Sequence, residues 1–221
     1  MGRFTGKVVS IVGAAGEDNM GQVMARRFAA EGAKVVVSGR HEAALSKLAE
    51  EIDGDWVLCD FSKKASINTM IDSIIERHGK LDVAINSTGW GLLVPLEENS
   101  EEQLDQMLDL QFKGPFVWLQ KLIQVMADTG GSIIQISSAT ANIMLDDHAA
   151  YMCTKAGTDH LIRCVANQYG PKGIRANVVL PGTIETPVWQ TRKDSRPDVF
   201  ELVKSWSLFY SSWKNIPQPW P

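Results

Sequence analysis

The fold of this 221-residue chain is decided near its start, where residues 7–21 read KVVSIVGAAGEDNMG. Residues 7–12 form a β-branched run typical of a buried strand, and residues 20–31 carry apolar side chains at the three- and four-residue intervals of an amphipathic helix. The glycines between them let the backbone approach a pyrophosphate, whose charge the helix N-terminus would stabilise. Their spacing differs from Gly-x-Gly-x-x-Gly, so a glycine-rich turn without a ligand is an equally good interpretation of this stretch alone.

The same strand-and-helix unit repeats along the chain. Apolar β-branched runs predict strands, and the longer amphipathic stretches between them predict helices. The predicted strands are residues 7–12, 34–38, 55–59, 82–85, 132–137 and 175–180, and the predicted helices are residues 20–31, 42–52, 63–78, 101–128 and 149–169. Parallel neighbours need crossover connections, so the alternation predicts a single α/β domain with a doubly wound, Rossmann-like parallel sheet. Ser100 with Gln103 matches a capping box, and Gly79 and Gly170 are predicted helix stops.

The composition is that of an ordinary globular protein. Lys plus Arg is 22 and Asp plus Glu is 26, which gives a net charge of −4, and 44% of the residues are hydrophobic. These values argue against disorder, a collagen-like chain and a basic surface for nucleic acid. No apolar run approaches the roughly 18 residues that cross a bilayer, and no signal region precedes the first strand. We therefore expect a cytoplasmic protein with neither a membrane nor a nucleic-acid partner.

The cysteines and histidines predict neither disulfides nor a metal site. Cys59, Cys153 and Cys164 are odd in number and contain no Cys-x-x-Cys pair, so we expect them to be reduced and mostly buried. The histidines show no His-Glu-x-x-His pattern.

A second constellation joins Ser138, Tyr151 and Lys155. Tyr and Lys at i and i+4 lie on one face of the predicted helix 149–169. A free phenol has a pKa of about 10, so proton exchange near neutral pH needs a shift of about 3 units, roughly 4 kcal/mol, much of which a neighbouring ammonium supplies. Ser138 ends the fifth predicted strand at the sheet edge that carries the glycine-rich turn. Its hydroxyl could hold a substrate oxygen while Tyr151 exchanges the proton.

Further stretches, taken in order, carry a family resemblance. They are the glycine-rich turn 13–21, Asp60, Asn-Ser-Thr-Gly at 86–89, residues 131–138, Tyr-x-x-x-Lys at 151–155 and residues 175–187. Over roughly residues 5–187 the chain resembles the short-chain dehydrogenase/reductase family. The resemblance implies hydride transfer between a nicotinamide and a carbonyl or secondary alcohol. It also implies that Tyr151 is the general acid/base, that Ser138 rather than Ser137 polarises the carbonyl, and that Lys155 lowers the tyrosine pKa and bonds the nicotinamide ribose.

The resemblance further implies a dinucleotide site. Its implied residues are Gly13, Ala15, Asn19, Met20, Gly21, Arg40, Asp60, Phe61, Asn86, Ser87, Thr88, Tyr151, Lys155, Pro181, Gly182, Ile184 and Thr186. After the second strand, Gly39 stands where an Asp or Glu would bind the ribose 2′-hydroxyl of NAD, and Arg40 could form a fork with a 2′-phosphate. NADP is therefore the preferred cofactor, with NAD as the alternative, since Arg40 could instead stack on adenine or cap the helix.

The chain departs from the family pattern in three places. Gln111 stands at the position of the family's proton-relay asparagine and lengthens the arm by one methylene, and we retain it as a fourth catalytic residue. The glycine-rich turn is longer than usual and carries Glu17 and Asp18, which we expect to point to solvent because they would repel a pyrophosphate. The sequence ends at Pro221, where the family would continue into a final helix and strand. A homo-oligomer, dimer or tetramer, is expected if those C-terminal elements exist.

The substrate side implied by the resemblance is largely apolar. Its residues are Trp90, Ser138, Met144, His148, Tyr151 and Trp189, with Leu92, Val94, Ile143 and Leu145 beside them. Such a wall suits a bulky hydrophobic ketone or alcohol. For His148 a solvent-facing position is the stronger expectation, and a hydrogen bond to a substrate oxygen is the alternative.

The chain divides into a dinucleotide-binding and catalytic part, residues 1–187, and a Trp- and Pro-rich part, residues 188–221, with a short helix near 197–206. We expect the second part either to form a lid over an apolar cavity or to pack its tryptophans on the domain surface, and the composition favours neither. The expected function is NADP-preferring interconversion of a bulky hydrophobic ketone and its alcohol. A reductase of 3-oxoacyl thioesters and a catalytically weak, dinucleotide-binding regulatory protein are the alternatives.

Overall fold

The computed structural model of the chain describes residues 2–182, 184, 197, 198 and 201. Two residues of the predicted site, Thr186 and Trp189, lie outside the described residues, as does most of the part 188–221. Residues 197, 198 and 201 are helical, within the short helix predicted near 197–206.

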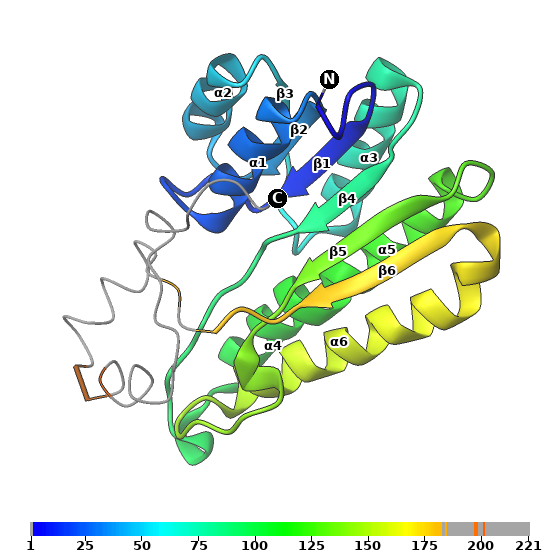
Figure 1. Ribbon diagram of the computed structural model, residues 1–221. Coiled ribbons are helices and arrows are strands. Elements are labelled where there is room, and N and C mark those ends of the chain that lie inside the picture. The colour runs from blue at the N-terminus through cyan, green and yellow to red at the C-terminus, as the bar shows by residue number, and fades with distance from the viewer. Residues whose placement is uncertain (1, 183, 185–196, 199–200, 202–221) are drawn as a thin grey trace.

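A six-stranded parallel sheet forms the centre of the molecule, in the order β3-β2-β1-β4-β5-β6 (Figure 1). The strands are β1 (Val8–Val12), β2 (Lys34–Gly39), β3 (Asp55–Leu58), β4 (Val83–Asn86), β5 (Gly131–Ile136) and β6 (Ile174–Val179). Because the order reverses between β1 and β4, the predicted doubly wound topology is confirmed. In such sheets, ligands bind outside the carboxyl ends of the strands at this reversal.

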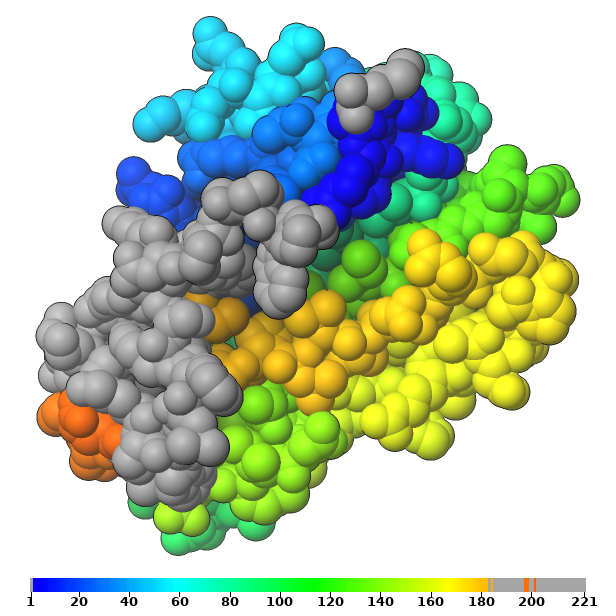
Figure 2. Space-filling model, in the orientation of Figure 1, coloured from blue at the N-terminus to red at the C-terminus, as the bar shows by residue number. Residues whose placement is uncertain are grey.

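Helices cover both faces of the sheet. They are α1 (Met20–Ala30), α2 (Glu42–Glu51), α3 (Lys64–His78), α4 (Glu101–Leu108), α5 (Gly114–Val125) and α6 (Ala149–Tyr169). Buried residues of α1 and α2, such as Ala25 and Leu45, form one apolar core with the sheet. Those of α3, α5 and α6, such as Met70, Trp118 and Ile162, form a second core on the opposite face. Figure 2 shows α6 and β6 side by side along one edge of the molecule.

Local sequence signals set several helix ends. The Ser100 hydroxyl accepts from the backbone N–H of Gln103, whose side chain accepts in turn from the Ser100 N–H at 3.0 Å, so the predicted capping box is present. Gly79 ends α3 with a φ of 70°. The predicted helix 101–128 is interrupted, because the turn Asp109–Lys113 between α4 and α5 is π-helical.

The predicted end of the helix at Gly170 is confirmed, because α6 ends at Tyr169 with Gly170 as its C-cap, although Gly170 lacks the left-handed φ common at that position. Gly170 has a right-handed φ of −55° and opens a 3₁₀ turn after α6. Pro171 favours helical φ and lets the turn continue. Gly173, with a φ of 76°, ends it.

All three cysteines are free. Cys59 is buried as expected, whereas Cys153 and Cys164 are exposed, contrary to the prediction, because α6 turns only one of its faces toward the sheet. No described helix combines the length and the apolar composition needed to cross a bilayer. Within the same part of the chain, His, Cys, Asp and Glu side chains do not gather into a group of three or more that could hold a metal ion.

Candidate active site

The carboxyl ends of β1, β4 and β5 lie at the same level. Their register pairs Val12 with Asn86 and Asn86 with Gln135. Buried Asn86 joins the two neighbouring segments, because its Nδ2 donates to Gln135 Oε1 at 2.9 Å. Its Oδ1 accepts from the Thr88 backbone N–H at 2.9 Å and from the Thr88 hydroxyl at 2.7 Å. The turn after β4 is therefore held by a side chain that is itself anchored to β5.

The glycine-rich turn packs against this edge without room for side chains. Gly13 has a φ of 92°, and a Cβ there would lie 2.7 Å from the carbonyl carbon of Ser87. A Cβ at Gly21 would lie 2.6 Å from the Gly13 carbonyl oxygen, so α1 begins directly against the turn. Asn19 caps α1, accepting from the Gln22 N–H at 3.0 Å and donating to the Gly13 carbonyl at 2.9 Å. A backbone-lined turn at a helix N-terminus is an arrangement that binds phosphate groups.

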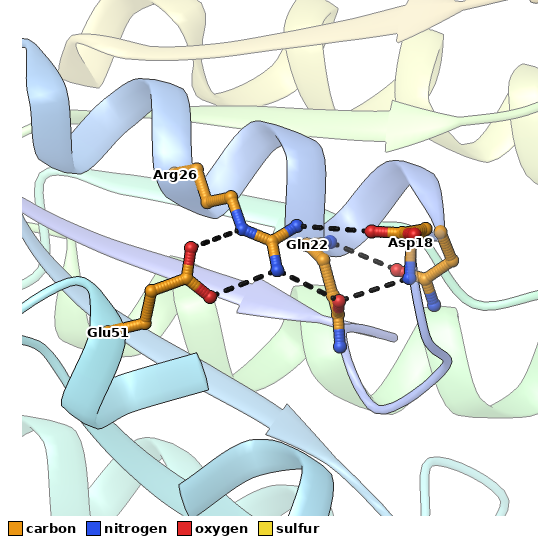
Figure 3. Close-up of polar contacts among 5 residues, drawn as sticks. Asp18, Gln22, Arg26 and Glu51 are labelled. Carbon is orange, nitrogen blue, oxygen red and sulfur yellow. Dashed lines mark hydrogen bonds and ion pairs between the residues drawn. The ribbon is translucent and has the colours of Figure 1, made fainter. Parts of the chain in front are cut away.

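The two acidic residues of the turn, Glu17 and Asp18, are exposed, as expected. Asp18 has a φ of 47°, and its carboxylate lies 3.7 Å from the guanidinium of Arg26 on α1. Figure 3 shows Arg26 between Asp18 and Glu51, with Gln22 accepting from both Arg26 and the Asp18 backbone. Because Arg26 partly compensates the charge of Asp18, an anion at the turn would meet less repulsion.

The end of β2 and the turn after β3 bring Arg40 near Asp60, two of the residues predicted for the dinucleotide site. Asp60 accepts from the Ser62 hydroxyl at 2.7 Å and from the Ser62 N–H at 3.1 Å. The Ser62 hydroxyl, and to a smaller extent the Arg40 guanidinium, hold the pKa of Asp60 below its usual value, so Arg40 lies within electrostatic reach of Asp60. A Cβ at Gly39 would lie 2.7 Å from the Ala15 methyl carbon, which leaves no space for a larger residue there.

Two residues predicted to bind the cofactor, Phe61 and Met20, turn their side chains toward the core. Phe61 is 3% exposed and meets Trp118 edge to face, with ring centroids 6.0 Å apart. Met20 is half-buried and packs against the core formed by α1 and α2. Any contact of Phe61 with a dinucleotide would therefore come from its backbone.

The fold brings Tyr151 and Lys155 together. Lys155 Nζ lies 5.7 Å from the centroid of the Tyr151 ring. The lysine is 3% exposed, and Nζ donates to the carbonyl oxygens of Thr88 at 3.3 Å and Ile136 at 3.2 Å. Burial lowers the pKa of Lys155 to about 8, and the Asp159 carboxylate acts in the opposite direction. An ammonium this close to a phenol favours the phenolate.

Ser138 follows β5 and begins the short turn Ala139–Ala141. Its Oγ lies 2.9 Å from the hydroxyl of Thr140 and accepts from the Thr140 N–H at 3.2 Å. The Ala139 N–H, directly after Ser138, donates to the Pro181 carbonyl at 2.9 Å. This bond brings Pro181, one of the residues predicted to bind the cofactor, beside Ser138. Ser137, the less favoured candidate, is buried.

Gln111 reaches the site from the π-helical turn Asp109–Lys113. Pro115 has no N–H to donate to the Gln111 carbonyl in an α-helical pattern, and the Thr158 hydroxyl donates to that carbonyl instead, at 2.5 Å. The Gln111 side chain donates to the Trp90 carbonyl at 3.3 Å, while its Oε1 is buried without a hydrogen-bond partner among the described residues. Most buried acceptors in proteins have a donor, and the described part of the chain supplies none to this oxygen.

The Gln111 side-chain oxygen and the Lys155 ammonium both lie beside Gly89. A Cβ at Gly89 would lie 3.6 Å from Gln111 Oε1 and 3.5 Å from Lys155 Nζ. Gln111 was predicted from the sequence, whereas Thr158, which donates to its carbonyl, was not. The available signal was Pro115 within the predicted helix, because a proline has no N–H for the carbonyl four residues earlier and so leaves that carbonyl in need of another donor.

His148 is 5% exposed, so the expectation of a solvent-facing position was wrong. The segment after β4 folds against the start of α6, and His148 Nδ1 lies 2.6 Å from the Leu92 carbonyl oxygen. The imidazole also stacks on the Tyr151 ring, with centroids 4.4 Å apart. Trp90 is half-buried, whereas Met144 is 71% exposed, so the described residues enclose only part of the predicted substrate wall.

Comparisons with known proteins agree with this geometry. The family whose model matches residues 13–209 is described as enoyl-(acyl carrier protein) reductase. An uncharacterized oxidoreductase of Schizosaccharomyces pombe is 36% identical over 91% of this chain and 76% of its own length. A 3beta-hydroxysteroid dehydrogenase of Mediterraneibacter gnavus is 34% identical over 85% of this chain and 70% of its own length. The crystal structure of levodione reductase matches with a TM-score of 0.86 and 26% identity, over 95% of this chain and 87% of that one.

Proposed function

The chain belongs to the short-chain dehydrogenase/reductase family and is an NAD(P)-dependent oxidoreductase, and from this premise we propose that it interconverts a bulky hydrophobic ketone and its secondary alcohol. The observation that carries the proposal is the Tyr151 phenol beside the buried ammonium of Lys155. Both lie at the sheet edge where Ser138 follows β5 and where ligands of such folds bind.

The residues at this edge fit a nicotinamide dinucleotide. The turn at Gly13 and Gly21 would be blocked by any Cβ, and it leads into the capped N-terminus of α1, where backbone N–H groups would hold the phosphates. Lys155 would bond the ribose from its position beside Tyr151. When bound, the nicotinamide supplies or accepts the hydride.

The chain's own residues hold and move the proton. In the direction of reduction, Tyr151 Oη donates a proton to the substrate oxygen, while the Ser138 hydroxyl donates a hydrogen bond to the same oxygen. The Lys155 ammonium stabilises the phenolate that results. In the direction of oxidation, the phenolate takes the proton from the alcohol.

Gln111 is the proposed residue that holds the water molecule of a proton relay next to Lys155. Its Oε1, which has no hydrogen-bond partner among the residues that the structure describes, and the Lys155 ammonium both lie beside Gly89. A water molecule there would accept from the ammonium and donate to the amide oxygen, two of the polar partners that a buried water needs. The longer glutamine arm would thus still serve a relay.

The proposed cofactor preference for NADP rests on Gly39 and Arg40. Gly39 carries no carboxylate that could bind the ribose 2′-hydroxyl of NAD, and a Cβ at this position would lie 2.7 Å from the Ala15 methyl carbon. Arg40 is exposed and close to Asp60, where its guanidinium could pair with a 2′-phosphate.

Replacing Arg40 with Ala tests this preference. A lost charge-assisted hydrogen bond costs about 1.5–3 kcal/mol, so the Kd for NADPH should rise by about tenfold to a hundredfold and the Kd for NADH far less. Lys47→Ala, which removes an exposed cation from α2, is the matched control. An equal rise in Kd for NADPH and NADH would refute the pairing of the Arg40 guanidinium with the 2′-phosphate.

The proposed substrate class rests on the half-buried Trp90 and the exposed apolar side chains of Ile143 and Met144. A relative named for a hydroxysteroid supports a bulky, apolar alcohol. The description of the matching family favours acyl thioesters as a second candidate class. A panel of ketones graded by size, with a 3-oxoacyl thioester included, separates the two.

The decisive experiment measures oxidation of NADPH and NADH with this panel, for the wild type and for Tyr151→Phe. Loss of a general acid should lower turnover by about 10²–10⁴-fold while the Kd for the dinucleotide stays unchanged. Tyr169→Phe, at the far end of α6, is the matched control. Undiminished turnover in Tyr151→Phe would remove the phenol from the mechanism. Dinucleotide binding without turnover of any substrate would instead favour a regulatory protein.

A further inference from the structure

Two segments far apart in sequence are joined beside the Tyr151 phenol. His148 Nδ1 lies 2.6 Å from the Leu92 carbonyl oxygen, and the Val94 N–H donates to the Asp147 carbonyl at 2.7 Å. A carbonyl oxygen only accepts, so Nδ1 carries the hydrogen and the tautomer of His148 is set by Leu92. The segment after β4 is thereby tied to the residues that begin α6.

The same histidine forms one wall of the Tyr151 ring. The two rings stack with centroids 4.4 Å apart and an interplanar angle of 23°. His148 also caps α6, since its carbonyl accepts from the Met152 N–H at 3.0 Å. His148, Tyr151 and Lys155 therefore occupy positions i, i+3 and i+7 on one face of the helix. The imidazole packs on one face of the Tyr151 ring, whose centroid lies 5.7 Å from Lys155 Nζ.

We propose that His148 is a positioning residue that sets the orientation of the Tyr151 phenol and makes it depend on the segment after β4. The inference rests on the proposed function of Tyr151 as general acid/base. It differs from the role of a substrate ligand, because Nδ1 is engaged by Leu92 and a ring face by Tyr151 within the protein itself.

The consequence for proton transfer is geometric. Transfer requires the phenol oxygen to lie within about 2.6–3.2 Å of the substrate oxygen. A phenol can turn about two side-chain torsions, and the stacked imidazole removes much of that freedom. A misplacement of about 1 Å can cost on the order of a hundredfold in rate. Since Leu92 follows Trp90 on the proposed substrate wall, a substrate that moves this segment would also move the imidazole that orients the acid.

The test separates the two contacts of His148. His148→Ala removes both the hydrogen bond and the stack, His148→Phe keeps an aromatic ring, and His148→Asn keeps an N–H donor. In His148→Ala, kcat should fall by about tenfold or more, while KM for the ketone and Kd for NADPH stay within about twofold. Each conservative variant should recover part of the lost kcat. His160→Ala, exposed on the same helix, is the matched control.

Two outcomes would overturn the inference. An unchanged kcat in His148→Ala would show that the contact does not orient the phenol. A raised KM at unchanged kcat would assign His148 to substrate binding instead.

A second measurement does not depend on turnover. The chain has 3 tyrosines, so ring-labelled tyrosine gives few NMR signals, and Tyr151→Phe assigns the one of interest. That signal should move in His148→Ala, because the stacked ring is lost, and should stay closer to its original position in His148→Phe. If the signal did not move while the wild type reduced ketones normally, the positioning inference alone would fail. If the signal moved but the wild type reduced nothing, the proposed function would fail while the contact would stand.

Discussion

The buried ammonium of Lys155 should make the stability of the protein depend on pH in a way that one substitution removes. Lys155→Met keeps the length of the apolar stem and deletes the charge. Burial lowers the pKa of Lys155 from 10.5 to about 8 in the folded protein. Between these two values the unfolded chain binds more protons than the folded one, so the free energy of unfolding rises with pH. The full cost of the buried charge is present below the folded pKa.

The size of the effect follows from the two pKa values. The difference of 10.5 minus about 8 is about 2.5 units, equivalent to about 3.4 kcal/mol. Integrated between about pH 7 and about pH 9.5, this linkage adds roughly 2 kcal/mol to the stability of the wild type relative to Lys155→Met. For a domain of this size, about 2 kcal/mol corresponds to a shift of roughly 4–8 °C in Tm.

Urea unfolding of both proteins at several pH values in this range provides the assay. The other lysines titrate equally in the two proteins, so their contribution cancels in the difference of the unfolding free energies. Lys47→Met, at an exposed position on α2, is the control. The difference in unfolding free energy between the wild type and Lys47→Met should not change with pH. A difference between wild type and Lys155→Met that stays constant to within about 0.5 kcal/mol would refute the reasoning, because Lys155 would then titrate alike in both states.

Three further substitutions test the rest of the site. Gly21→Ala should weaken dinucleotide binding and lower the free energy of unfolding by about 1–3 kcal/mol, because its Cβ would lie 2.6 Å from a carbonyl oxygen of the glycine-rich turn. Calorimetry measures the Kd for the dinucleotide, and urea unfolding measures the stability. Asp159→Asn removes the carboxylate that raises the pKa of Lys155, so an NMR titration of the lysine should give a pKa below the wild-type value, and an unchanged pKa would contradict the coupling. Gln111→Asn should keep or raise kcat for the ketone, whereas a collapse would show that position 111 does something other than relay protons.

The element order was predictable because its signals are local. Hydrophobic periodicity within each segment defined the strands and helices. Ser100 and Gln103, which are three residues apart, marked the start of α4. Parallel pairing then followed from the crossover connections. The spacing of Tyr151 and Lys155 on one helix placed the proposed acid and its ammonium together, because the helix period alone decides which residues share a face.

Contacts between distant segments decided the surroundings of those groups. The partner of His148 lies 56 residues away, so the amino-acid order alone left this histidine exposed, whereas the folded chain buries it against Tyr151. The donor to the Gln111 carbonyl lies 47 residues away on another helix. Side-chain types and local periods are written in the sequence, but burial and hydrogen-bond partners depend on which segments the sheet brings together.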